Sequence, residues 1–255
     1  MILELNPELA VWYKSNSQKI RKISEPWTEE NIFCPNCWNH LINLENNKPV
    51  SDFLCENCTE NYEQKASKHK FKNKVLSSEY YTLIKRLNSK EKPHFFFLHY
   101  IDKKYLVNDF FVVPKYFFLP EIIEKRKPLS DKAKRAWWVG SNILFWEIPN
   151  FWKIYYVEDG KENSQKEILE KWEKTKFFEE IKQVKSKWWV LDIMNIVESL
   201  EKKEFELQDI YNFENDLRIL HPENNNIKAK IRQQLQVLRD KWYLEFVRKW
   251  EYRVL

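Results

Sequence analysis

Two closely spaced pairs of cysteines constrain this chain more than any other feature of its sequence. C-P-N-C at residues 34–37 is followed, after seventeen residues, by C-E-N-C at residues 55–58, and the pattern uses every cysteine of the 255-residue chain. Each C-x2-C turn lets two thiolates hold one ion, and two such turns complete a tetrahedral site. Because sulfur fills all four positions, we expect a structural zinc ion, with no position left for a reacting water, bound by Cys34, Cys37, Cys55 and Cys58.

Other uses of the four cysteines fit the sequence less well. A redox-active motif needs a single C-x-x-C beside a βαβ unit, whereas this chain carries two copies. Disulfides need an oxidising compartment, but residues 1–14 lack the basic segment, apolar core and cleavage site of a secretory signal. No stretch approaches the roughly 18 apolar residues that span a membrane. We therefore expect a cytoplasmic protein with reduced thiols and no membrane partner.

Composition removes further functional classes. The chain contains only two glycines, Gly140 and Gly160, so it lacks the glycine-rich loops that cradle nucleotide phosphates. Its net charge of +5 is mild, but residues 65–74 hold five lysines and one histidine with no acid, and residues 221–255 hold eight basic residues against four acidic ones. Each run alone is commonly a solvated surface, so the charge pattern favours a nucleic-acid partner only weakly.

The larger part of the chain alternates between strand and helix patterns. The short apolar runs typical of buried strands are residues 95–100, 109–113 and 154–157. Apolar residues at helical spacing predict a helix over residues 75–87, and the charged stretch 160–183 is predicted to be mainly helical. This alternation predicts an α/β domain with a mixed central sheet. We place the domain boundary so that the two domains comprise residues 1–183 and 184–255.

The spacing of apolar residues changes in the second predicted domain. Apolar residues at helical spacing predict three helices, over residues 189–200, 210–217 and 227–238, and alternating apolar residues predict a β-hairpin over residues 242–254. This order describes a winged helix-turn-helix, whose third helix enters the major groove of DNA. The outward face of that helix carries residues suited to phosphates and base edges, namely Lys228, Arg232, Gln233 and Gln236. The alternative is a small helical domain that binds protein or nothing.

Carboxylates bracket the second cysteine pair. Asp52 precedes it, and Glu63-Gln64-Lys65 follows it. In a strand, Glu63 and Lys65 point to the same face, and Asp52 on a neighbouring strand can face them. Two carboxylates, with the Gln64 carbonyl as a further ligand, suit Mg²⁺, and a nearby lysine can orient an attacking water. The alternative is a surface ion pair, because D-x10-E-x-K also arises by chance in charged proteins.

Several segments together resemble the DpnI restriction endonuclease family from end to end. These segments are Y-K-S-N-S-Q-K at residues 13–19, C-P-N-C, E-N-N-K-P-V-S-D-F-L-C-E-N-C at residues 45–58, E-Q-K, F-F-F-L at residues 95–98, and I-K-A-K-I-R-Q-Q-L-Q-V-L-R-D-K at residues 227–241. The resemblance implies a PD-(D/E)XK nuclease domain followed by a winged helix. It implies cleavage of double-stranded DNA at GATC sites whose adenine carries an N6-methyl group. Under it Asp52, Glu63 and Lys65 match the catalytic triplet, and Gln64 matches the residue whose carbonyl binds the metal.

The resemblance also bears on how methylation is read. Trp138 matches the aromatic residue through which the nuclease domain of this family senses methyl groups, and it follows a basic stretch of Lys132, Lys134 and Arg135. Because residue 137 is also tryptophan, Trp137 can share or replace that role. The alternative for Trp138 is an ordinary core aromatic. The stretch 151–185 matches the family poorly, which leaves the linker between the domains undefined.

These patterns converge on one function, with two alternatives. We expect a monomeric bacterial type II restriction endonuclease that uses structural Zn²⁺ and catalytic Mg²⁺ to cut DNA containing methylated adenine. Adenine methylation and GATC come only from the resemblance. One alternative is a non-catalytic, zinc-containing winged-helix regulator that binds DNA, which would leave Asp52, Glu63 and Lys65 a coincidence. The other is a protein-interaction module with an aromatic interface.

Overall fold

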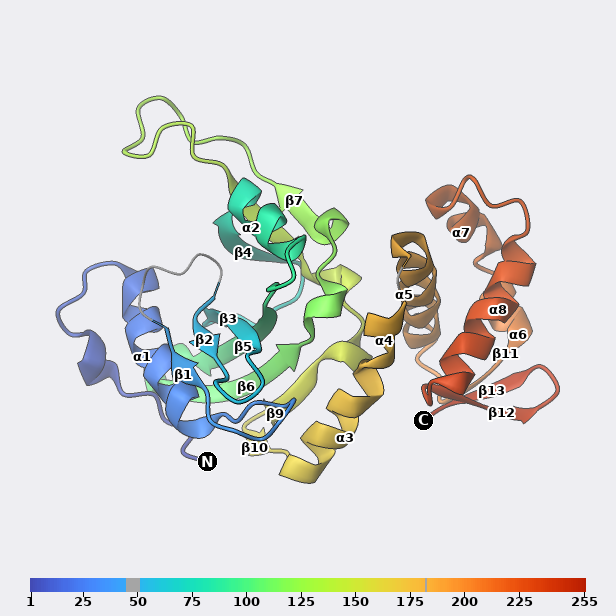
Figure 1. Ribbon diagram of the computed structural model, residues 1–255, viewed down its shortest axis with the longest axis horizontal. Coiled ribbons are helices and arrows are strands. Elements are labelled where there is room, and N and C mark those ends of the chain that lie inside the picture. The colour runs from blue at the N-terminus through green and yellow to red at the C-terminus, as the bar shows by residue number, and fades with distance from the viewer. Residues whose placement is uncertain (45–50, 182) are drawn as a thin grey trace. The chain divides into compact units, whose positions relative to one another are not determined.

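The chain forms two compact units in the computed structural model, residues 1–172 and 173–255 (Figure 1). The structure describes residues 1–44, 51–181 and 183–255. The helices of the first part of the chain are α1 (Asn16–Asn31), α2 (Tyr80–Leu87) and α3 (Gln165–Thr175), preceded by a 3-10 turn, η1 (Pro7–Ala10).

A seven-stranded mixed sheet forms the centre of the first unit. Its strand order is β1-β2-β3-β5-β6-β9-β10. The bounds are β1 (Ile42–Asn43), β2 (Phe53–Leu54), β3 (Asn61–Ser67), β5 (His94–Ile101), β6 (Leu106–Val113), β9 (Ile154–Glu158) and β10 (Lys161–Glu162). β3 and β5 run parallel, and the other neighbours in this sheet run antiparallel. The prediction of an α/β domain with a mixed central sheet is therefore confirmed.

The middle of this sheet is buried on both faces, as its apolar sequence predicts. Every residue of β5 except Ile101 is buried. On one face Phe96 stacks on Tyr62 of β3 at 4.7 Å, in a core that also contains residues of α1 and α3. On the other face Phe97 stacks on Phe111 of β6 at 5.2 Å. The three predicted strands at residues 95–100, 109–113 and 154–157 lie within β5, β6 and β9.

A second, smaller sheet corrects one prediction. β4 (Lys74–Glu79), β7 (Ile123–Lys125) and β8 (Gly140–Leu144) form it in the order β4-β8-β7. The helix expected over residues 75–87 is therefore wrong for residues 75–79, and α2 begins only at Tyr80. The apolar spacing misled because Leu76 is exposed and β4 pairs with β8, a strand more than sixty residues away. Glu79 ends the strand and caps the helix, its carboxylate accepting from the Thr82 backbone N–H at 2.6 Å.

The second unit has the order of elements predicted for a winged helix-turn-helix. Its elements are α4 (Phe177–Glu180), α5 (Val184–Ser199), β11 (Glu204–Glu206), α6 (Leu207–Tyr211), α7 (Glu214–Leu220), α8 (Ile227–Asp240), β12 (Leu244–Arg248) and β13 (Glu251–Val254). The strands form a small antiparallel sheet in the order β11-β13-β12. The helix expected over residues 210–217 is divided into α6 and α7 by Asn212 and Phe213. The predicted fold is otherwise confirmed.

In the part of the chain that the structure describes, no helix is long and apolar enough to cross a bilayer.

Candidate functional site

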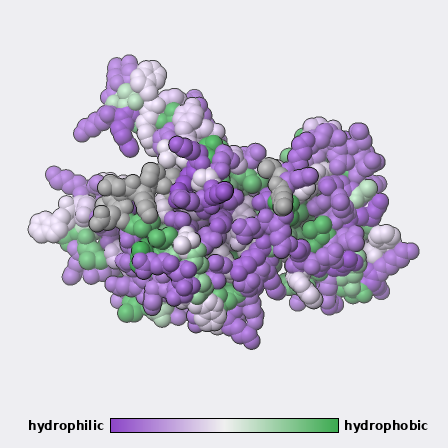
Figure 2. All heavy atoms as spheres, viewed as in Figure 1, coloured by the Kyte–Doolittle hydropathy of each residue, from purple (hydrophilic) through white to green (hydrophobic). Residues whose placement is uncertain are grey.

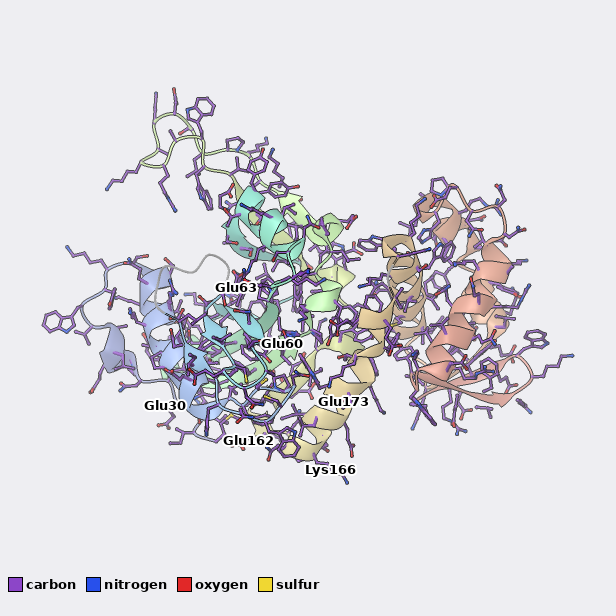
Figure 3. All side chains as sticks on the ribbon, viewed as in Figure 1. Glu30, Glu60, Glu63, Glu162, Lys166 and Glu173 are labelled. Carbon is purple, nitrogen blue, oxygen red and sulfur yellow. The ribbon has the colours of Figure 1, made fainter. Side chains whose placement is uncertain are left out.

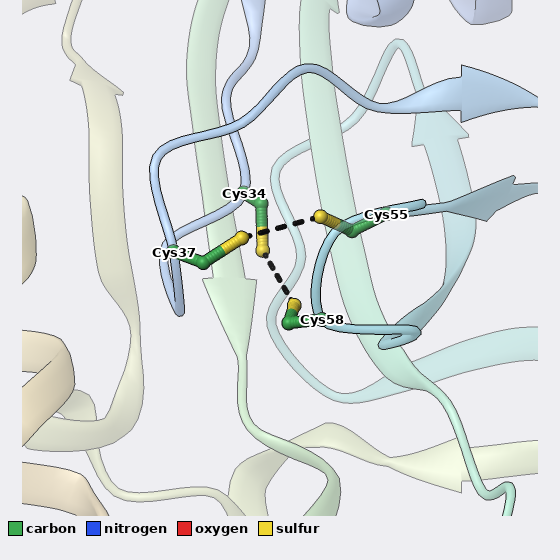
Figure 4. Close-up of side chains that lie close together, drawn as sticks. All are labelled: Cys34, Cys37, Cys55 and Cys58. Carbon is green, nitrogen blue, oxygen red and sulfur yellow. Dashed lines mark hydrogen bonds between the residues drawn. The ribbon is translucent and has the colours of Figure 1, made fainter.

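The four cysteines meet in one cluster (Figure 4). The sulfur atoms of Cys34 and Cys58 are 3.5 Å apart, those of Cys37 and Cys55 are 3.3 Å apart, and all four lie within 4.8 Å of one another. A tetrahedral zinc with Zn–S bonds of about 2.3 Å places its sulfurs roughly 3.8 Å apart, so this donor set fits a zinc ion. Among the described residues, this is the one cluster of three or more Cys, His, Asp or Glu side chains with that geometry.

Two turns of the same design hold the cysteines. In the first turn the Trp38 N–H donates to the carbonyl of Cys34 at 2.8 Å, and in the second the Thr59 N–H donates to the carbonyl of Cys55 at 2.8 Å. Trp38 and Thr59 both adopt a left-handed backbone, with φ of 69° and 59°. This conformation is unfavourable for residues with a side chain and persists where the surroundings enforce it, as a shared metal ion would.

The thiols differ in their surroundings. Burial raises the pKa of Cys34, whose sulfur lies 3.0 Å from the hydroxyl of Tyr62. Burial also opposes ionisation of Cys37, but hydrogen bonds from the Asn39 backbone and the Asn57 side chain outweigh it and lower the pKa of Cys37 to about 6. A buried thiol such as Cys34 becomes a thiolate when a cation compensates its charge, which is what a bound metal ion does.

The second cysteine turn is the tip of the β2–β3 hairpin, and this hairpin carries the predicted acidic residues. Phe53 pairs with Tyr62 and Leu54 pairs with Asn61, so Asp52 and Glu63 follow as the next opposed positions. β2 pairs with only the first two residues of β3. The cluster therefore clamps the closed end of the hairpin, and the carboxylates lie just beyond its last ladder pair.

Asp52 is held by hydrogen bonds of both its main chain and its side chain, and its carbonyl accepts the backbone N–H of Leu44 at 2.8 Å. Its backbone N–H donates to the Tyr62 carbonyl at 2.8 Å. Its Oδ2 accepts the backbone N–H of Gln64 at 2.8 Å, and its Oδ1 accepts from Nη2 of Arg21 at 3.3 Å. Both carboxylate oxygens of Asp52 therefore have partners, one from the backbone of β3 and one from a helix.

Glu63 and Lys65 point to the same face of β3 and contact each other. The Lys65 amino group donates to Oε1 of Glu63. Glu63 is buried, and its Oε2 has no hydrogen-bond partner among the described residues (labelled in Figure 3). Burial raises the pKa of Glu63, while the ammonium of Lys65 acts to lower it and the nearby charge of Asp52 acts to raise it. A buried carboxylate oxygen without a partner is costly, and a cation at this point would remove that cost.

Helix α1 presents a polar face to β3 that the sequence analysis missed. The residues of this face, spaced at i, i+3, i+4 and i+7, are Arg21, Ser24, Glu25 and Thr28. Thr28 donates to Oε1 of Gln64 at 2.6 Å, and Nε2 of Gln64 donates to Ser24 at 2.9 Å. The Gln64 side chain is thus committed to α1, which leaves only its main chain for a metal. Polar residues at this spacing in an otherwise amphipathic helix were the available signal.

An open cleft of about 950 Å³ lies over these residues. Asp52, Glu63 and Lys65 line it, together with basic residues that follow β3, namely Lys68, His69 and Lys70 before β4 and Lys74 at the start of β4. Lys68 pairs with Asp102 at 3.0 Å and Lys70 pairs with Asp159 at 2.9 Å, all on exposed side chains. Exposed pairs of this kind contribute little and exchange readily, so the basic run at residues 65–74 borders the cleft as a surface that phosphates can approach.

The two adjacent tryptophans lie in an arm between β7 and β8, residues 126–139. Figures 1 and 2 show this arm projecting beyond α2 with a mostly hydrophilic surface. Trp138 is half-buried, and its ring lies so close to Gly140 that a Cβ there would meet it at 2.7 Å. The guanidinium of Arg135 lies 4.9 Å from the ring centre. Trp137 is 73% exposed with φ of 65°, so Trp137 is the more exposed of the two tryptophans.

The predicted recognition residues share the outer face of α8. Lys228, Arg232, Gln233 and Gln236 are all exposed, whereas Ile227, Ile231, Leu235 and Leu238 are buried. Arg232 donates to the hydroxyl of Tyr211 at 2.6 Å, and the Lys228 ammonium lies 5.2 Å from the same ring. Tyr211, on α6, was not singled out from the sequence, because only the fold brings α6 against α8.

Of the segments on which the resemblance was based, residues 45–50 lie outside the described residues, whereas Asp52 and the cysteines lie within them. Two family models match the chain. One, described as the DpnI Dam-replacing family, matches residues 1–181, and the other, described as the Dam-replacing HTH domain, matches residues 185–254. The chain therefore belongs to the DpnI Dam-replacing family, with that family's catalytic domain followed by its helix-turn-helix domain.

Proposed function

We propose that this chain is a methylation-dependent type II restriction endonuclease. It cleaves double-stranded DNA at GATC sites that carry N6-methyladenine, by magnesium-assisted hydrolysis of a phosphodiester. Family membership and the helix-turn-helix domain support DNA as the partner. The observation that supports hydrolytic activity is the buried Oε2 of Glu63, which lies beside Asp52 and Lys65 and has no hydrogen-bond partner within residues 1–44, 51–181 and 183–255.

The residues present fit a magnesium ion. Asp52 and Glu63 offer carboxylate oxygens, the donors that this hard cation prefers, and the main-chain carbonyl of Gln64 is the third proposed ligand. In the described part of the chain the buried Oε2 of Glu63 has no hydrogen-bond partner, and such an ion would supply one. When bound, magnesium would polarise the scissile phosphate and neutralise the charge that develops on it.

The protein's own groups have separate tasks in this proposal. The Lys65 ammonium orients the attacking water towards phosphorus and stabilises developing negative charge. The water oxygen bonds to phosphorus and gives up a proton to solvent as one P–O bond breaks, and the released oxygen takes up a proton from solvent. Asp52, fixed by the Gln64 N–H, keeps its carboxylate opposite Glu63 throughout. The four cysteines hold a structural Zn²⁺ that keeps the hairpin, and hence this geometry, in place.

Both domains take part in reading the DNA. Trp138, or Trp137 at the more exposed position, contacts the methylated site from the nuclease domain of residues 1–183. From residues 184–255, Lys228 and Arg232 neutralise phosphates, and Gln233 and Gln236 reach base edges in the major groove. We propose a monomer that acts in the bacterial cytoplasm.

Digestion of one plasmid prepared with and without adenine methylation tests the proposal. With Mg²⁺ the purified protein should convert only the methylated plasmid to fragments, and EDTA should stop the reaction. The alternative, a winged-helix regulator without catalytic activity, predicts binding to the plasmid and no cleavage of either preparation under any metal condition.

A further inference from the structure

Arg21 on α1 links two carboxylates at the edge of the candidate active site. Its Nε donates to Oε1 of Glu25 at 2.5 Å, and its Nη2 donates to Oδ1 of Asp52 at 3.3 Å. The first bond is short and local, one helical turn apart, and the second is long and reaches across to the β2–β3 hairpin. The guanidinium therefore has one firmly held end and one loosely held end.

The side chain of Glu25 is fixed in place by burial and by its hydrogen bonds. Its side chain is 9% exposed against 39% for Arg21, and its Oε2 accepts from the Asn43 side chain at 3.4 Å. A buried carboxylate needs a charged partner, and among the described residues Arg21 is the cation that the structure pairs with it. Breaking the contact between Arg21 and Glu25 would thus be costly. Breaking the contact between Arg21 and Asp52 would cost less, because it is one long hydrogen bond and the Asp52 side chain is 18% exposed.

Asp52 cannot serve a metal ion and Arg21 equally well. Its Oδ2 is engaged by the Gln64 N–H, so a cation arriving from the cleft meets Oδ1, where Nη2 of Arg21 now lies. Arg21, Glu25, Asp52, Glu63 and Lys65 all line the same cleft. A divalent cation at Asp52 would repel the guanidinium over this short distance and free its outer nitrogens.

We propose that Arg21 is a further catalytic residue: it neutralises Asp52 in the metal-free enzyme and passes to the scissile phosphate when the metal ion binds. Glu25 is the positioning residue that anchors Nε during the exchange. When the carboxylates of Glu25, Asp52 and Glu63 are ionised, the cations Arg21 and Lys65 leave the site with a net charge of about −1. A divalent metal ion would change this net charge to about +1, and the single negative charge of one phosphodiester would then neutralise the site. A planar guanidinium suits this task because its separate N–H groups can hold a carboxylate and a phosphate at once. This inference rests on the proposed nuclease function.

Two measurements on Arg21→Gln, moving in opposite directions, test the exchange. Mn²⁺ titrated into the protein without DNA, and followed by electron paramagnetic resonance, should bind about tenfold more tightly than to wild type, because a competing charge is gone. Single-turnover cleavage of methylated plasmid with saturating Mg²⁺ should fall about 100-fold, because a phosphate donor is gone. Lys22→Gln, the same charge change at the next residue of α1, should alter neither value.

A purely structural role predicts a different result. If Arg21→Gln binds Mn²⁺ as wild type does, or more weakly, or cuts at the wild-type rate, the exchange is wrong. Should Arg21→Gln fail to fold because Glu25 is left unpaired, Arg21→Gln/Glu25→Gln removes both charges and must show the same pair of changes. If wild type binds Mn²⁺ but cuts no DNA, the proposed function fails, and the titration alone then decides whether Arg21 competes with the metal.

Discussion

The carboxylate of Asp52 accepts the backbone N–H of Gln64 at 2.8 Å, where a longer β2 would have offered a backbone carbonyl. Strand β2 pairs with β3 only at Phe53 and Leu54, so the side chain of Asp52 takes over the next position of the ladder. The acidic residue is thereby oriented by the same strand that carries Glu63 and Lys65. The cysteine cluster at the other end of the hairpin holds both strands together.

This bond determines how Asp52 should be substituted. Asp52→Asn keeps an oxygen for the Gln64 N–H but loses the charge that binds a metal ion, so we expect a folded protein that retains DNA binding and cuts at least 100-fold more slowly. Lys65→Ala should also lose cleavage and keep binding. Single-turnover rates with Mg²⁺ and mobility shifts with Ca²⁺ measure the two properties. Glu91→Gln, at an exposed site outside the cleft, is the control, and near wild-type cutting by Asp52→Asn would refute the assignment.

The cysteine cluster should contain one zinc ion per chain by elemental analysis. Cys55→Ser removes one ligand from the turn at the hairpin tip, so we expect loss of zinc, a lower melting temperature and loss of cleavage, because Asp52 and Glu63 lose their alignment. A Cys55→Ser protein that is folded, free of zinc and fully active would separate the metal from the active site.

The outer face of α8 should contribute DNA affinity through charge. Arg232→Ala should weaken binding of a methylated GATC duplex and lower the slope of log affinity against log salt by about one unit, as expected for one lost phosphate contact. Arg253→Ala is the control, because Arg253 is paired with Glu204 and Glu245 on the small sheet. Gln234 on α8 itself is not suitable, because its side chain is buried. An unchanged slope for Arg232→Ala would mean that Arg232 does not contact a phosphate.

Residues 184–255, expressed alone, should fold and bind methylated GATC more tightly than the unmethylated duplex. The methyl group on N6 projects into the major groove, which α8 is proposed to enter. Fluorescence anisotropy with the two duplexes compares the affinities. Equal affinities would assign methyl recognition to the nuclease domain and its tryptophans alone.

The buried Asp109 should make stability depend on pH. Burial acts to raise the pKa of Asp109, but hydrogen bonds from the Asp159 backbone N–H, Asn108 and His99 outweigh it, so its pKa lies below the ordinary value. A lowered pKa stabilises the fold at pH above the unfolded-state pKa, and this contribution is lost as pH falls through the folded-state pKa. Asp109→Asn should therefore lower the melting temperature at pH 5, and the difference from wild type should shrink by pH 3. A difference that is the same at both values would contradict this.

The local patterns of the sequence were sufficient to predict the central strands β5, β6 and β9 and the cysteine cluster, but contacts between residues distant in sequence could not be predicted from them. The apolar run of β5 predicts a buried strand, and the spacing of the cysteines predicts that their four side chains come together. The pattern of residues 75–79 is compatible with either a helix or a strand, and these residues form a strand because they pair with the distant β8. The polar face of α1 was overlooked because Ser24 and Thr28 have a purpose only once Gln64 lies beside them.

The two tryptophans of the β7–β8 arm show the same limit. The sequence alone does not show which of the two is more exposed, but Gly140 lets the ring of Trp138 pack against the backbone, whereas Trp137 is 73% exposed. Tyr211 likewise joins Lys228 and Arg232 only through the packing of α6 on α8. Such neighbours depend on the completed fold and not on any local period.

The most direct measurement is cleavage of a short duplex containing a single GATC site, prepared with N6-methyladenine on both strands or on neither. Wild-type protein with Mg²⁺ should cut the methylated duplex within the site and leave the unmethylated duplex intact, while Asp52→Asn should bind the methylated duplex and leave it whole. Equal cutting of the two duplexes, or binding of the methylated duplex by wild type without any cutting, would contradict the account.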